Sequence, residues 1–130
     1  MNSSNTPKIM RWIGYVLSAI PVLMMGVVGT GVLLFGSKMA AEGMAKQGYP
    51  PGAAKPLLIV EIVSAILYAI PRTAVLGAIL LTGYLGGAVA THVRAGEKEW
   101  FIPVLFGIVV WLGLWFRDAR VRALAPLRAA

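Results

Sequence analysis

The chain has 130 residues, of which 58% are hydrophobic and only 13% are charged. This balance is too apolar for an ordinary soluble domain, and the length suits a single domain. Without cysteine the chain forms no disulfide and carries no thiol redox centre, and a single histidine excludes a bis-histidine haem site in one copy. The net charge of +7 comes from basic residues at the ends of apolar runs, a placement that favours lipid headgroups over nucleic acid.

The first apolar run predicts a membrane-spanning helix over residues 12–36. A spanning helix needs about 20 residues, and this run is about twice as long as the core of a signal peptide. We therefore expect the helix to be retained, with a mild kink at Pro21. Residues 38–55 follow as the one sizeable loop. Its first half is predicted either to extend the helix or to form a short interfacial helix.

The second apolar block, residues 56–91, is too long for one crossing. As a single helix it would measure about 54 Å, against a hydrocarbon core of about 30 Å. The segment Pro71-Arg72-Thr73 is the plausible break, because it combines a helix breaker with a charge, and Thr73 can cap the next helix. The block therefore predicts a hairpin of two helices, residues 56–71 and 73–93.

The last apolar run predicts a helix over residues 100–116, with Trp100 and Trp115 near its ends as interfacial aromatics. A basic tail follows at residues 117–130. The predicted fold class is therefore all-α, a transmembrane four-helix bundle. Basic residues are more numerous on the side that holds both termini and the Arg72 turn, so we expect both termini in the cytoplasm.

Glu61 is the one acidic residue inside an apolar span. It lies about 15 Å from the hairpin turn, close to the bilayer midplane, where a carboxylate should face the bundle interior. Ser64 and Tyr68 share its helical face, while Thr82 and Tyr84 lie nearby on the returning helix. We therefore predict a polar pocket between the helices. Either Glu61 serves a ligand or proton site there, or it bonds to hydroxyl groups and only holds helices together.

Charged residues at the two membrane faces extend this set. His92 and Arg94 end the third helix, where they either neutralise its C-terminus or contact a headgroup or a quinone carbonyl. Arg72, at the opposite face, is either a topology anchor on lipid phosphate or the entrance to the pocket. No metal site is predicted, because no cluster of His, Asp and Glu has ligand spacing. The candidate ligand-binding residues are Glu61, Ser64, Tyr68, Arg72, Thr82, Tyr84, His92 and Arg94.

Gly83 and Gly87 form a GxxxG pair that lets helices approach closely. The pair is predicted either to pack inside the bundle or to form a homo-oligomer interface.

Several stretches of the sequence carry a family resemblance. They are Gly48-Tyr49-Pro50, Glu61, Tyr68 with Ile70-Pro71-Arg72-Thr73, Leu76-Gly77-Ala78, Leu80 to Ala88, Thr91-His92-Val93-Arg94, Trp111-Leu112-Gly113-Leu114, Arg117-Asp118 and Arg120 to Leu124. Over roughly residues 48–128 the chain resembles the DoxX-like family of small four-helix membrane proteins. The resemblance implies a bundle in the bacterial inner membrane. The wider family includes a subunit of a thiosulfate:quinone oxidoreductase and members associated with redox stress, but it supplies no agreed catalytic residue.

Three functions follow as alternatives. The first is a redox-associated accessory protein with no covalent cofactor and no catalytic activity of its own, which binds a quinone or another lipophilic small molecule around Glu61. The second is a small proton-coupled transporter that uses Glu61. The third is a structural subunit of a larger membrane complex. The expected partners are membrane lipids, a lipophilic small molecule, and a homo-oligomer or larger membrane complex.

Overall fold

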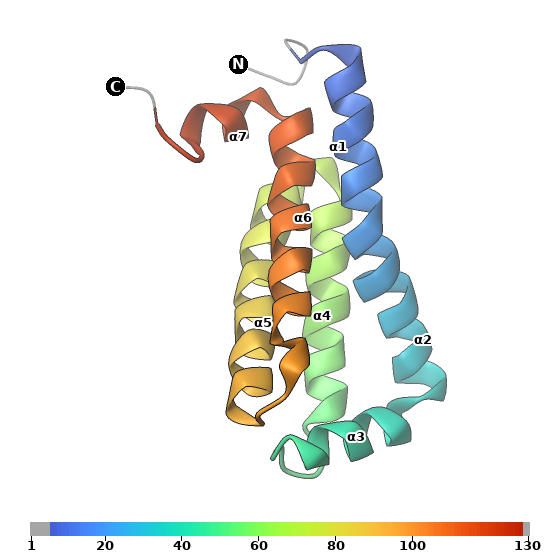
Figure 1. The fold of residues 1–130 in the computed structure, drawn as a ribbon. Coiled ribbons are helices and arrows are strands. Elements are labelled where there is room, and N and C mark those ends of the chain that lie inside the picture. Colours follow the sequence, from blue (N-terminus) through green and yellow to red (C-terminus); the bar gives the residue numbers. More distant parts are fainter. Residues whose placement is uncertain (1–5, 129–130) are drawn as a thin grey trace.

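The computed structural model describes residues 6–128, and every regular element in this range is a helix. The elements are α1 (Lys8–Pro21), the π-helical turn η2 (Val22–Val27), α2 (Val28–Phe35), α3 (Ser37–Lys46), α4 (Ala54–Ala69), the 3₁₀ turn η3 (Pro71–Thr73), α5 (Ala74–Arg94), the 3₁₀ turn η4 (Lys98–Trp100), α6 (Phe101–Arg117) and α7 (Ala119–Leu124). α1, η2 and α2 form one continuous column, and α4, α5 and α6 are the other three columns of the bundle (Figure 1). The structure confirms the predicted all-α membrane bundle.

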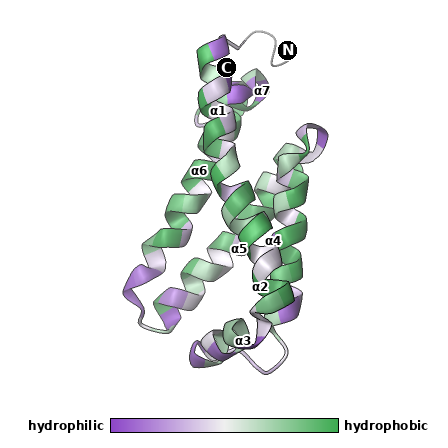
Figure 2. Cartoon of the chain, turned by 90° about the vertical axis from the view of Figure 1, so that its right-hand side faces the viewer, coloured by the Kyte–Doolittle hydropathy of each residue, from purple (hydrophilic) through white to green (hydrophobic). Residues whose placement is uncertain are grey.

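The outer surface of the bundle is apolar. Leu34, Ile79 and Leu105, on three different columns, are each more than half exposed. Figure 2 shows the hydrophobic residues along the columns and the hydrophilic ones gathered toward their ends. Within the described residues, three helical stretches are long and apolar enough to cross a membrane: Lys8–Phe35, Pro71–Arg94 and Lys98–Arg117. Exposing so much continuous apolar surface to water is unfavourable, and the protein is therefore embedded in a membrane.

α4 is the shortest column, with 16 residues and a length of about 24 Å. It runs beside α5 and also packs against η2 and α2. The centre of the bundle lies where α4, α5 and α6 meet, around the fully buried Tyr68, Leu81 and Val110.

The first column bends below Pro21 (Figure 1). Proline lacks the N–H group of a helical hydrogen bond and crowds the preceding turn, and the six residues after it adopt a π-helical turn. Above this turn α1 packs against α6, whereas η2 and α2 pack against α4. Because of this bend, the first part of the column packs against α6 and the second part packs against α4.

The chain after this column forms a separate helix rather than an extension of it. Gly36 interrupts the helical conformation, and α3 lies across the end of the bundle (Figure 1). Two turns with glycines at positive φ, Gly48 (91°) and Gly52 (85°), then lead the chain back into α4. The predicted loop over residues 38–55 is therefore half helix and half turn.

The hairpin break occurs where it was predicted. Ile70 is extended, as expected of a residue before proline, and residues 71–73 form a single 3₁₀ turn. The predicted capping role of Thr73 is wrong in one respect. Thr73 stands at the N-terminus of α5, but its hydroxyl donates backward to the carbonyl of Leu67, at 2.7 Å, and caps no amide of α5.

Candidate functional site

Glu61 lies half-buried on α4, where it faces both α5 and the first column. The hydroxyl of Tyr84, on α5, donates to Glu61 Oε2 at 3.2 Å. On the other side, a Cβ placed on Gly29 of α2 would lie only 3.9 Å from the same oxygen. Among the described residues Tyr84 is the one hydrogen-bond partner of this carboxyl group. The carboxyl group therefore keeps most of its hydrogen-bonding capacity for another group.

Glu61 and Tyr84 form part of the wall of a cavity of about 290 Å³. Its other lining residues are mainly apolar and come from η2, α5 and α6, with two further ionisable groups at the end nearer α3: Met24, Met25, Leu85, His92, Glu99, Ile102, Pro103 and Phe106. A few polar groups on a mainly apolar wall are typical of sites for small lipophilic ligands.

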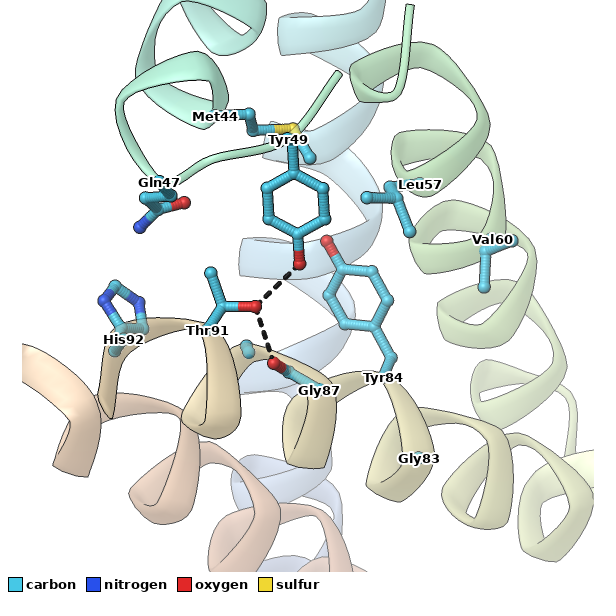
Figure 3. A pocket seen from close by; sticks show the side chains of 11 residues that line it. Met44, Gln47, Tyr49, Leu57, Val60, Gly83, Tyr84, Gly87, Thr91 and His92 are labelled. Carbon is cyan, nitrogen blue, oxygen red and sulfur yellow. Dashed lines mark hydrogen bonds between the residues drawn. The ribbon is translucent and has the colours of Figure 1, made fainter. Parts of the chain in front are cut away.

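A second cavity, of about 430 Å³, lies between α5, α4 and the segment after α3 (Figure 3). Tyr84 and His92 line both cavities, so these two side chains form the shared wall. Tyr49 bonds to the hydroxyl of Thr91 at 2.6 Å, and Thr91 donates to the carbonyl of Gly87 at 2.8 Å. Because a threonine hydroxyl has a single proton, Tyr49 is the donor to Thr91.

Polar contacts fasten the segment after α3 to the turn between α5 and α6. Gln47 donates to both carboxylate oxygens of Glu97, at 3.2 and 3.1 Å, and Glu97 in turn pairs with His92 Nδ1. Arg94 donates to the backbone carbonyl of Gln47 at 3.0 Å. These contacts hold Tyr49 over α5 and close the second cavity at the end of the bundle that carries α3.

The structure brings together part of the predicted residue set. Glu61, Tyr84 and His92 line one cavity, and Arg94 lies beside the neighbouring one, bonded to Gln47. Arg72 is exposed on the hairpin turn, at the opposite end of the bundle.

Ser64, Tyr68 and Thr82 do not reach Glu61. Ser64 donates to the carbonyl of Val60 in its own helix, at 2.6 Å. Thr82 donates to the carbonyl of Ala78, accepts from Trp111 Nε1 at 2.7 Å, and lines a groove beside α6 and α7. The polar pocket that the sequence predicts is thus smaller than expected, and it lies toward the α3 end.

Tyr68 belongs to a separate contact between three columns. Its side chain is fully buried, and its hydroxyl lies 3.0 Å from Ser18 Oγ on α1 and 2.8 Å from the carbonyl of Val110 on α6. Gly113 makes room for this contact, since a Cβ there would lie 2.4 Å from Ser18 Oγ. Tyr68 therefore contacts both α1 and α6 and holds α4 against them.

Gly83 and Gly87 do not pack inside the bundle. A Cβ on either would meet no atom of the described residues within 4 Å, and both line the second cavity. The sequence also missed Gln47, Tyr49 and Glu97. The contacts of Gln47 with Glu97 and of Tyr49 with Thr91 span 50 and 42 residues along the chain, and no local pattern predicts such a separation. The one available signal was Tyr49 itself, which stands in a stretch that carries the family resemblance.

The arrangement offers hydrogen-bonding groups to a ligand. Among the described residues, no group of three or more His, Asp or Glu side chains is placed to hold a metal ion. The carboxyl group of Glu61 and the hydroxyl of Tyr84 lie side by side and can engage a carbonyl, hydroxyl or cationic group of a molecule in the cavity.

The model of the DoxX-like family matches residues 16–113, a range that includes α4, α5 and all the residues that line the cavity around Glu61. No curated protein and no solved structure matches the chain. The family match, which covers most of the sequence, agrees with the all-α membrane bundle, and the chain belongs to the DoxX-like family.

Proposed function

We propose that this protein binds a lipophilic small molecule of the quinone type in the cavity beside Glu61 and Tyr84, and serves as a redox-associated accessory protein. The observation that supports it is the Glu61–Tyr84 pair on the wall of a mainly apolar cavity within the membrane bundle. Quinone carbonyls accept hydrogen bonds, and the Tyr84 hydroxyl can donate to one of them when its single proton turns away from Glu61 Oε2. The redox association rests on the family resemblance, and the electron carrier is the bound molecule or a partner.

The dimensions support a ligand of this size. The cavity beside Glu61 has a volume of about 290 Å³, and the adjoining one behind Tyr84 and His92 has about 430 Å³. Sites for drug-sized ligands typically measure about 300–1,000 Å³. A quinone ring in the first cavity would place its tail along the apolar side chains of Met24, Ile102 and Phe106.

Binding is tested with purified protein and decylubiquinone as the probe. We expect wild-type protein to bind about one molecule per chain. Both Glu61→Leu and Tyr84→Phe should weaken the affinity about tenfold, because each removes a hydrogen-bonding group from a dry site. Native mass spectrometry and quenching of tryptophan fluorescence measure the affinity.

Two matched variants serve as controls. Glu42→Gln removes a carboxylate from the exposed face of α3, and Tyr15→Phe removes a hydroxyl from the outer face of α1. Both should bind decylubiquinone as wild type does. Equal affinity in all five proteins, or no binding by wild type, would contradict the quinone proposal.

A proton-coupled transporter of lipophilic cations is the second candidate. Glu99 lines the same cavity as Glu61, so two carboxylates face a space with aromatic walls, which favours a cationic ligand. Tetraphenylphosphonium is the probe. Proton release into weakly buffered solution when it binds to wild type but not to Glu61→Gln would favour transport over quinone binding.

We also propose that the protein lies in the bacterial inner membrane with both termini in the cytoplasm. The start of α1, the η3 turn and the end of α6 share one end of the bundle, and α3 lies at the other (Figure 1). Basic side chains are more numerous at the first end: Lys8, Arg11, Arg72, Arg117, Arg120, Arg122 and Arg128, against Lys38, Lys46, Lys55, Arg94 and Lys98. This excess orients proteins with their basic side inward.

Because the chain has no cysteine, single-cysteine variants report this topology directly. In intact spheroplasts, we expect an impermeant maleimide to label Lys46→Cys and to leave Arg72→Cys unlabelled until the membrane is broken. The reverse pattern would overturn the proposed orientation, and labelling of both in intact cells would contradict a paired hairpin across the membrane.

A further inference from the structure

Three arginines near the end of α6 differ in their hydrogen-bond and ion-pair partners. Arg120 pairs with Asp118 through two side-chain hydrogen bonds, at 3.1 and 3.0 Å. Arg122 donates to the carbonyls of Trp115 and Phe116 and to the hydroxyl of Thr6. Arg117 forms no ion pair with any of residues 6–128, and its Nε has no hydrogen-bond partner.

The Arg117 guanidinium is nevertheless held in a defined place. It lies 5.5 Å from the ring centroid of Tyr68 and 5.7 Å from that of Tyr15, so the side chain sits between two aromatic residues from α4 and α1. The aliphatic part of its side chain begins where α1 and α6 approach each other closely, because a Cβ on Gly14 would lie 2.7 Å from Arg117 Cβ. The cation is therefore fixed rather than free to search for a partner in solution.

The nitrogens of the Arg117 guanidinium differ in their burial and in their hydrogen-bond partners. Nε is sealed from solvent and has no partner, while neither terminal nitrogen is both buried and unpaired. Arg117 as a whole is only partly buried, so the described residues do not enclose its side chain completely. Contacts with aromatic rings are a weak substitute for an anion, and a partly buried charge is stabilised when a counter-charge completes its hydrogen bonds.

No carboxylate of the described residues forms an ion pair with Arg117. Asp118 is the nearest along the chain. Burial raises its pKa, but the hydrogen bonds from Arg120, together with the charges of Arg120 and Arg117, outweigh this and hold the pKa of Asp118 below its usual range. Asp118 is thus ionised, and its carboxylate oxygens are bonded to Arg120. A group outside the described residues can therefore complete the pairing of Arg117.

The surroundings indicate the chemistry of that group. Trp12 is 63% exposed on α1, and Trp115 lies two residues before Arg117, which marks this end of the bundle as the level of the lipid headgroups. Arg11 stands one helical turn before Tyr15, so a second guanidinium lies at the same end. Phosphate is the anion of this zone, and the guanidinium plane matches two phosphate oxygens at once.

We propose that Arg117, supported by Arg11, forms a binding site for a phosphate group at the end of the α1–α6 pair. The phosphate is that of a phospholipid headgroup or of a soluble phosphate compound. The site lies at the opposite end of the bundle from the α3 segment and shares no residue with the cavity around Glu61.

The proposal is tested by native mass spectrometry of the full chain in a phosphate-free detergent. The probes are phosphatidylglycerol, diacylglycerol with the same acyl chains, and inorganic phosphate. We expect wild type to bind phosphatidylglycerol and not diacylglycerol. Arg117→Gln should bind phosphatidylglycerol about tenfold more weakly, because it loses charge-assisted hydrogen bonds. The matched control is Arg128→Gln, which removes one charge from the exposed tail and should bind as wild type does.

Competition by inorganic phosphate at millimolar concentration would identify a soluble phosphate as the ligand, and its failure to compete would identify the lipid headgroup. Equal loss of binding in Arg117→Gln and Arg128→Gln would overturn the proposal, because net charge alone would then explain it. If Arg117→Gln does not fold, Arg117→Lys supplies the measurement. Binding by Arg117→Lys equal to wild type would also overturn the site, since a guanidinium would not be needed.

Discussion

Replacing Gly77 with alanine is expected to destabilise the protein by about 3 kcal/mol, the upper part of the usual range for overpacking a core. An ideal Cβ on Gly77 would lie 2.2 Å from the backbone nitrogen of Tyr68 and 2.5 Å from its Cα. These atoms belong to the backbone, so no side-chain rotation relieves the clash. The two helices of the hairpin must separate, and the buried residues between them lose contact. Thermal unfolding in detergent, followed by circular dichroism, measures the loss.

The same helix contains a matched control. Gly83 lies two turns further along α5, and a Cβ there would meet no atom within 4 Å. Alanine is the better helix former by about 1 kcal/mol, so Gly83→Ala should leave stability unchanged or raise it slightly. Equal destabilisation by the two substitutions would show that helix flexibility, rather than the close approach at Gly77, governs stability.

Removing the hydroxyl of Tyr68 is expected to lower stability by about 1–2 kcal/mol, a large effect for a single oxygen atom. The hydroxyl lies within hydrogen-bond distance of both Ser18 and the carbonyl of Val110, in a fully buried position. Tyr68→Phe keeps the ring but leaves the carbonyl of Val110 without this donor in a dry environment.

Tyr15→Phe is the control for this change. Its side chain is 56% exposed, and its ring lies near Arg117, as that of Tyr68 does. Denaturant titration of both variants in one detergent compares them. A destabilisation by Tyr15→Phe as large as that by Tyr68→Phe would contradict the role assigned to the buried hydroxyl.

The sequence predicted the architecture well, because membrane helices can be recognised from long apolar runs with charges at their ends. The hairpin break at Pro71, the bend below Pro21 and a helix in the first half of the loop all follow from local physics. These features depend on neighbours in the chain or on the period of a helix. Tyr84 was predicted to lie near Glu61 on the returning helix, but the sequence did not single it out as the hydrogen-bond partner of Glu61.

The composition of the site was harder to predict, because a shared helical face does not imply a shared pocket. Tyr68 lies seven residues from Glu61, about 10 Å along the helix axis, and meets a different set of neighbours. Ser64 and Thr82 show a second reason. In an apolar environment a hydroxyl bonds back to the carbonyl four residues earlier, as both do, and then has less to offer a ligand. Gln47 and Tyr49 reach the site only through the path of the chain after α3.

The bend in the first column determines how the proposed ligand would enter the cavity. Below Pro21 the column rests on α4 and no longer on α6, while Met24 and Met25 from its π-helical turn face Ile102 and Phe106 of α6 across the cavity of Glu61. That side of the cavity is bounded by side chains rather than by packed backbones, and it faces the lipid. A ligand that enters sideways is drawn from the bilayer, so its occupancy follows its mole fraction among the lipids. Dissociation constants measured at different amounts of detergent or lipid should therefore agree only when the ligand concentration is expressed as its mole fraction in the detergent or lipid.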